Sequence, residues 1–207
     1  MLLHDKLKSY NVILASASPR RRELLRATGI EYHLAEKFEC EETYHASLDA
    51  MEVAPYLSLL KSHAYPTALA YNDLLITADT TVVLDGKVLG KPSTESEARE
   101  MIAALAGREH SVVTGVTLRM QDRERTFSSQ SKVRFAPLST EQIDYYVDNY
   151  HPMDKAGAYG IQGKFAPFID GIDGDYYNVV GFPIAAVISE TRALGVDLLS
   201  DEYCQIA

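Results

Sequence analysis

Short apolar runs alternate along this chain with segments in which apolar residues recur every three or four positions, a pattern that predicts strands and helices in turn. Residues 12–15 are typical of a short buried strand. A helix is expected directly after them, because Ser18 suits the N-cap, Pro19 suits the first helical position and Gly29 suits the end. A strand, a tight turn and a helix N-terminus in this order often build a phosphate site.

The same alternation continues along the rest of the chain, and Asp85-Gly86 marks a hairpin turn. No internal repeat and no long linker interrupts it. Strands that alternate with helices, with one hairpin inserted, predict a single three-layer α/β domain over residues 1–207. The expected helices cover residues 50–71, 94–107, 139–150 and 184–195, the expected strands cover 74–84, 88–89, 111–120 and 126–135, and a glycine-rich stretch covers 157–174.

The composition is that of an ordinary globular protein, with 46% hydrophobic and 24% charged residues among 207. Acidic residues outnumber basic ones, 29 to 20, and the formal net charge is −9. A broad basic surface for nucleic acid or anionic lipid is therefore not expected. Any anion that this protein binds must be held by a local cluster of positive charge.

Cysteine content and apolar runs together indicate a cytoplasmic protein. Cys40 and Cys204 lie far apart in the sequence, which excludes a disulfide scaffold and a zinc knuckle. The N-terminal residues carry charges where a signal peptide needs an apolar stretch. The longest apolar run, 179–188, is about half a membrane span. We therefore expect no association with a membrane.

The sharpest feature is the segment SASPRRR at residues 16–22. A helix N-terminus carries a partial positive charge, so three arginines in the first turn are unfavourable unless an anion lies beside them. A phosphate chain is the simplest such anion, with Ser16, Arg20 and Arg21 as candidate ligands, and a solvated basic turn is the alternative. Because an arginine there adds nothing favourable to the helix, we expect Arg21→Ala to cost little stability.

Three further charged residues interrupt apolar patterns. Asp79 lies in the strand-like run 76–82, where a charge is paired, metal-bound or functional unless it marks the end of the strand. Lys91 follows the hairpin return, and its alternative is an exposed loop lysine. Lys61 lies in an apolar helical pattern, where a lysine that extends its ammonium into solvent is the commoner case.

Two other segments allow both a structural and a functional interpretation. The acidic residues within 36–42 suit a solvated loop or a magnesium site, since hard divalent cations take carboxylate oxygens. In the sequence YGIQG at 159–163, glycines flank Gln162 and allow close approach to the edge of a base. The six histidines share no spacing, so none is assigned to catalysis or to a metal.

Taken together, these segments resemble the Maf family of nucleoside triphosphate pyrophosphatases, whose members share an SxSPRR opening. The resemblance is weakest over residues 31–72, where only Glu42-Thr43 and Lys61 match. The YGIQG sequence is similar to the branch of the family that acts on dTTP and UTP. The other matching blocks are ADT at 78–80, LDGK at 84–87 with GKP at 90–92, DKAGAYGIQG at 154–163 and GDYYNVVG at 174–181.

The resemblance implies an ITPase-like (Maf/Ham1) α/β fold, an elongated mixed sheet with two lobes around a central cleft, and a homodimer. It also implies hydrolysis of a nucleoside triphosphate between the α- and β-phosphates with Mg²⁺ or Mn²⁺. For catalysis, the matching residues are Asp79, as the proton acceptor, with Lys61, Lys91 and Glu42. Glu42 and Asp79 match the metal ligands. The residues that match those recognising the nucleobase are Arg20, Thr80 and Gln162.

Alternatives to dTTP and UTP hydrolysis are hydrolysis of 7-methyl-GTP, a non-hydrolytic nucleotide-binding regulator of cell division, and an oligomeric structural module. The presence of Asp79, Lys61, Lys91 and Glu42 favours turnover, because a pure binder needs neither a base nor a metal carboxylate. A glutamine amide both donates and accepts, so Gln162 suits the O4 and N3–H edge of thymine or uracil.

Overall fold

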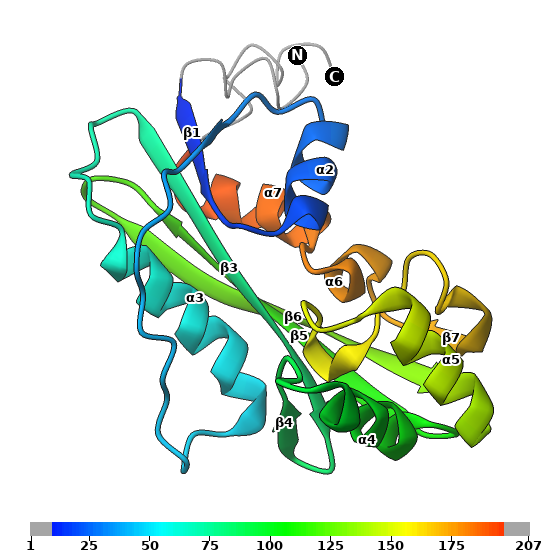
Figure 1. Ribbon diagram of the computed structural model, residues 1–207. Helices are drawn as coiled ribbons and strands as arrows, with labels where there is room; N and C mark the ends of the chain where they lie inside the picture. The colour runs from blue at the N-terminus through cyan, green and yellow to red at the C-terminus, as the bar shows by residue number, and fades with distance from the viewer. Residues whose placement is uncertain (1–9, 197–207) are drawn as a thin grey trace.

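The computed structural model describes residues 10–196 and shows a seven-stranded mixed sheet with helices on both faces (Figure 1). This confirms the expected α/β class. The strands are β1 (Asn11–Ala15), β2 (His33–Leu34), β3 (Asp73–Leu84), β4 (Lys87–Leu89), β5 (Glu109–Arg119), β6 (Glu124–Phe135) and β7 (Ile169–Asp173). The α-helices are α2 (Pro19–Ala27), α3 (Val53–Ala64), α4 (Glu95–Leu105), α5 (Thr140–Tyr150), α6 (Tyr176–Val180) and α7 (Ile184–Ala193), and the 3₁₀ turns are η1 (Ala50–Glu52), η2 (Ala156–Ala158) and η3 (Ala166–Phe168).

The strands follow the order β2-β1-β3-β5-β6-β7, and β4 pairs with β3 outside this path. β1 runs parallel to both of its neighbours, and the remaining pairs are antiparallel. The expected helix over 50–71 ends at Ala64, two residues before Pro66, because the residue that precedes a proline disfavours the helical region. β7 was not expected, since it lies within the glycine-rich stretch.

One edge of β3 is interrupted. β1 pairs with residues 73–77 of β3 and β4 pairs with 82–84, both on the edge opposite β5. Residues 78–81 therefore have β5 on one side and, within residues 10–196, no strand on the other. This gap lies where the N-terminal part of the sheet meets the hairpin.

Helix α3 covers one face of the sheet, on the opposite side of β3 from α2 and α7 (Figure 1). A Cβ at Gly115 would lie 2.2 Å from the backbone nitrogen of Pro55, so the close approach of α3 to β5 requires glycine there. The side chain of Ser58, fully buried on α3, lies 3.0 Å from the Thr117 hydroxyl, and Thr77 donates to the Ser58 carbonyl at 2.7 Å. These contacts fix α3 on the face from which Asp79 projects.

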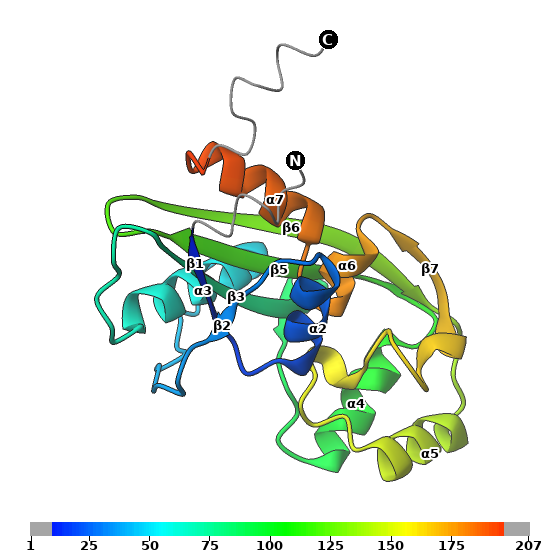
Figure 2. The ribbon, with the colours of Figure 1, turned by 90° about the horizontal axis from the view of Figure 1, so that it is seen from above.

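The other face carries two separate groups of helices, which complete the three layers. α2, α6 and α7 pack with β1 around Leu14, Leu25 and Phe182, whereas α4 and α5 form a second cluster around Ile102 and Phe135. Figures 1 and 2 show α4 and α5 side by side, away from α7. Ala78 belongs to the first cluster and Val82 to the second, so the gap in β3 lies between the two lobes.

No helix within residues 10–196 is both long enough and apolar enough to cross a membrane. Cys40 is a partly buried free thiol, and Cys204 lies outside the described residues.

Candidate functional site

Asp79 occupies the interior of β3, opposite Gly115 of β5, rather than a strand end or a turn. Its side chain is only 16% exposed. A carboxylate can occupy the middle of a strand at this point because residues 78–81 have no neighbouring strand on one edge. Asp79 therefore does not mark the end of a strand, and its charge is paired with that of Lys61.

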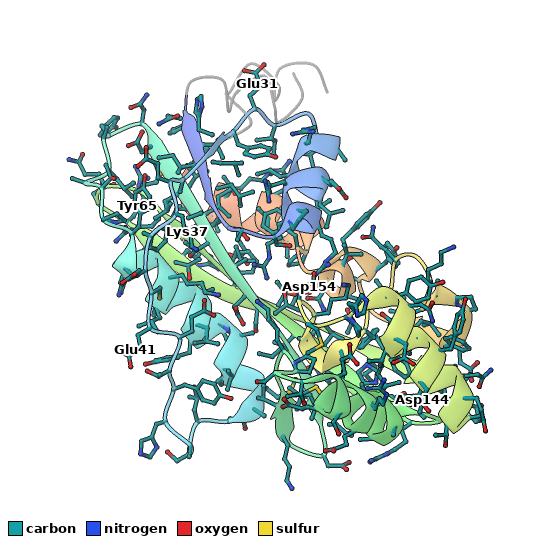
Figure 3. The ribbon with its side chains drawn as sticks, in the orientation of Figure 1. Glu31, Lys37, Glu41, Tyr65, Asp144 and Asp154 are labelled. Atoms are coloured by element: carbon teal, nitrogen blue, oxygen red, sulfur yellow. The ribbon has the colours of Figure 1, made fainter. Side chains whose placement is uncertain are left out.

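Lys61, in the last turn of α3, lies between two carboxylates. Its Nζ lies 2.6 Å from Oδ1 of Asp79 and 2.9 Å from Oε2 of Glu42. Glu42 comes from the extended segment between β2 and η1, which runs beside α3; its neighbour Glu41 is labelled there in Figure 3. Lys61 therefore does not extend into solvent. The three charges sum to one negative charge in a partly buried site, and three separate segments supply them.

Arg21, at the start of α2, binds protein acceptors with most of its guanidinium. Nε donates to the Gly181 carbonyl at 2.8 Å, and Nη1 donates to the Ala78 carbonyl at 2.9 Å and to Oγ of Ser16 at 3.2 Å. Nη2 donates to the Thr80 hydroxyl at 2.9 Å. Arg21 therefore joins α2, β3 and α6. These contacts favour a structural contribution, in place of the expected small effect of Arg21→Ala on stability.

The electrostatic environment of Arg21 agrees with this structural role. Burial lowers the pKa of its guanidinium, while the negative charges of Asp79 and Glu42 oppose that shift and Arg20 adds to it. Because an arginine pKa is far above neutral, the guanidinium stays charged. A fixed positive charge thus lies beside the gap in β3.

Arg20 contacts the second lobe through Asp154. Its Nη1 lies 3.4 Å from Oδ2 of Asp154, whose other oxygen binds Lys155. Burial raises the pKa of Asp154, but the hydrogen bond and charge of Lys155, with the charge of Arg20, reverse that shift and lower it overall. These contacts connect the start of α2 with the loop before η2.

Thr80 projects from the face of β3 opposite Asp79 and begins a chain of buried hydrogen bonds. Its hydroxyl lies 3.0 Å from that of Thr114, which donates to the Asn178 carbonyl at 3.0 Å. The fully buried Asn178 amide donates to the Val112 carbonyl and to Ser131 Oγ. The block at 174–181 therefore holds Thr80 and Arg21 in place, a function that its residues alone do not indicate.

Comparison with known proteins agrees with this arrangement: residues 11–194 match the family described as Maf-like protein. The chain belongs to the Maf family. A relative from Phocaeicola vulgatus, named dTTP/UTP pyrophosphatase, is 46% identical over 92% of this chain and 99% of its own. Another of the same name, from Symbiobacterium thermophilum, is 47% identical over 91% of this chain and 96% of its own. A HAM1 protein from Coxiella burnetii covers 62% of this chain and 74% of its own at 16% identity, but the TM-score of 0.39 is too low to support a conclusion.

Two residues that the Maf resemblance assigns are exposed. Lys91 lies two residues after Leu89, which pairs with Val82 at the border of the gap. Gln162 lies in the loop after η2 with its side chain exposed. The structure therefore brings Asp79, Lys61 and Glu42 into contact, and it leaves the side chains of Lys91 and Gln162 at the surface.

His110 supports the loop that carries Gln162 in this Maf protein. Its Nε2 lies 2.8 Å from the Tyr159 hydroxyl, and its ring packs edge-on against Phe135 with centroids 4.8 Å apart. The side chain is 4% exposed, and burial lowers its pKa to about 4, with a smaller opposing effect from Glu109. His110 is therefore neutral in the folded protein near pH 7.

The buried His110 predicts a loss of stability in mild acid. Because its pKa is about 4 when folded and 6.5 when unfolded, the unfolded chain takes up a proton first as the pH falls. We expect this residue to lower the free energy of unfolding by roughly 3 kcal/mol between about pH 6.5 and pH 4. Urea unfolding across this pH range should show that the free energy of unfolding decreases less in His110→Gln than in the wild type. In the exposed control His33→Gln, the decrease should equal that of the wild type. Equal decreases in both variants would contradict the assignment.

Proposed function

We propose that this protein hydrolyses dTTP and UTP to the nucleoside monophosphate and pyrophosphate. The observation that carries the proposal is the contact of Lys61 with both Asp79 and Glu42 in the gap of β3. A base, a cation and a second carboxylate lie together beside the cationic start of α2. Relatives that carry the name dTTP/UTP pyrophosphatase over nearly their whole length support the choice of substrate.

Hydrolysis of the α–β anhydride requires a water molecule positioned at the α-phosphorus and neutralisation of the charge that develops on the phosphate oxygens. Asp79 is partly buried and can accept the proton of that water. The ammonium of Lys61, 2.6 Å from Oδ1, holds the Asp79 carboxylate in position. Arg20 and Lys91 border the gap and supply positive charge to the phosphate chain, which the net charge of −9 does not.

The carboxylates fit a hard divalent cation. Glu42 and Asp79 converge on one ammonium and so lie on the same side of the site, and no group of three His, Cys, Asp or Glu side chains in residues 10–196 offers a complete cage. Mg²⁺ typically takes one or two protein carboxylates with waters and substrate phosphates, so two are sufficient. We propose that Glu42 and Asp79 hold Mg²⁺ or Mn²⁺, which would neutralise charge on the phosphate oxygens.

We propose that Gln162 and Arg20 select the base, and that Thr80, whose hydroxyl bonds Arg21 and Thr114, contributes by positioning Arg21. The Gln162 amide can accept from N3–H and donate to O4 of thymine or uracil, and its exposure leaves both groups free for a ligand. A site built to hydrogen-bond one edge rejects bases that leave its polar groups unpaired. The homodimer and the cytoplasmic location that the sequence suggests stay predictions.

Substrate competition tests this proposal. The kcat/KM for dTTP and UTP should exceed that for ATP and 7-methyl-GTP by at least about tenfold, the size expected for mispaired polar groups. Gln162→Glu loses the donor and should change this ranking, whereas Gln121→Glu, which adds the same charge in the turn between β5 and β6, should not. Comparable kcat/KM values for all four nucleotides would refute base selection by Gln162.

A further inference from the structure

The Asp154 carboxylate is shared by two cations that come from distant parts of the chain. Arg20 Nη1 lies 3.4 Å from Oδ2, and the Lys155 ammonium binds Oδ1. The Asp154 side chain is 61% exposed, while those of Arg20 and Lys155 are 31% and 24% exposed. The cations are thus more buried than the carboxylate that they bind. Figure 3 shows Asp154 on the side of its lobe that faces the start of α2.

The stem of Lys155 lies across the backbone of the loop that carries Gln162. A Cβ at Gly160 would lie 3.2 Å from both Cδ and Cε of Lys155. The same loop is fixed to the end of the hairpin, because the Gly157 N–H donates to the Gly90 carbonyl at 3.0 Å. Lys155 thus shares Asp154 with Arg20, whose neighbour Arg21 binds Ala78 and Thr80 in the gap of β3. Its loop is also anchored to Gly90, next to Lys91.

A single exposed carboxylate holds such cations weakly. Exposed ion pairs contribute little to stability, since water screens them and long side chains lose entropy. A phosphate chain offers several negative oxygens, and charge-assisted hydrogen bonds to phosphate are among the stronger polar contacts in proteins. A triphosphate that enters the gap would therefore compete successfully with Asp154 for its cations.

We propose that Lys155 is a further substrate-binding residue. Its ammonium leaves Asp154 and binds a phosphate oxygen of the nucleotide. Before the nucleotide binds, Asp154 is the counterion of Lys155 and Arg20. This inference rests on the proposed function. It assigns a role to the first two residues of the DKAGAYGIQG block, which neither the catalytic cluster nor base selection uses.

Isothermal titration with a non-hydrolysable α,β-methylene analogue of dTTP, in the presence of Mg²⁺, tests the proposal. Lys155→Met keeps the apolar stem over Gly160 and removes the charge, and we expect affinity to fall by about tenfold. Tripolyphosphate, which has no base, should show the same loss. Lys164→Met, a matched change at an exposed lysine in the same region, should bind both ligands as the wild type does.

The outcomes separate this inference from the proposed function. Asp154→Asn should bind the analogue as tightly as the wild type or more tightly, because a competing anion is removed. Three results would overturn the inference. Lys155→Met could bind both ligands with wild-type affinity, or it could lose affinity for the dTTP analogue alone. The third is a tenfold loss of affinity in Asp154→Asn. Failure of the wild type to hydrolyse dTTP would instead refute the proposed function. Thermal unfolding of Lys155→Met should match that of the wild type within about 2 °C, since the ion pair is exposed.

Discussion

Replacement of Asp79 by asparagine should reduce dTTP turnover by roughly 10²–10⁴-fold, the usual contribution of a positioned general base. Asparagine has nearly the same volume but cannot accept the proton of the attacking water, and it is a poorer ligand for a divalent cation. Lys61 keeps its second contact, 2.9 Å from Glu42, so the local structure is retained. Steady-state kinetics with dTTP and Mg²⁺ measures this change.

The matched control is Asp122→Asn in the exposed turn between β5 and β6, which should leave turnover unchanged. Circular dichroism and thermal unfolding should show that Asp79→Asn is folded. Turnover close to that of the wild type in the folded variant would exclude Asp79 as the base.

Arg21→Ala should lower the free energy of unfolding by roughly 3–5 kcal/mol. The change removes four hydrogen bonds that a charged group donates and leaves the Ala78 and Gly181 carbonyls without this partner. Arg21→Lys should recover little of the loss, because an ammonium on a flexible stem does not reproduce the planar guanidinium fork. Urea denaturation of the three proteins measures the difference.

Arg22→Ala provides the comparison within the same helical turn. Arg22 makes one side-chain hydrogen bond, to the Ala17 carbonyl at 2.9 Å, so its loss should cost about 1 kcal/mol. If Arg21→Ala unfolds at the wild-type urea concentration and changes only KM, then Arg21 is a free phosphate ligand rather than a structural one.

The order of strands and helices was predictable because each has its own periodicity. The alternation of apolar runs and helical spacing located β1, α2, β3, α4, β5 and β6 to within a few residues. β7 was missed because Ile169 and Ile172 are three positions apart, which is not the period of a strand, and because it lies inside a glycine-rich segment. A β-bulge in its pairing with β6 accommodates this spacing. A short strand of this kind depends on its pairing with β6 rather than on its own sequence.

The site was predictable in its residue types and not in its contacts. The charge of Asp79 in an apolar run indicated a functional group, but the gap that accommodates it arises only when β1 and β4 pair with the same edge of β3. The structural role of Arg21 depends on the Ala78 and Gly181 carbonyls, 57 and 160 residues away in the sequence. No local pattern around residue 21 contains that information.

The most direct test of the central claim is product analysis by ³¹P NMR after incubation of the purified protein with dTTP and Mg²⁺ or Mn²⁺. Hydrolysis at the site formed by Asp79, Lys61 and Glu42 should give dTMP and pyrophosphate in equal amounts, and Asp79→Asn at the same concentration should give almost none. Formation of dTDP and phosphate, or no turnover of dTTP with either metal, would contradict the account.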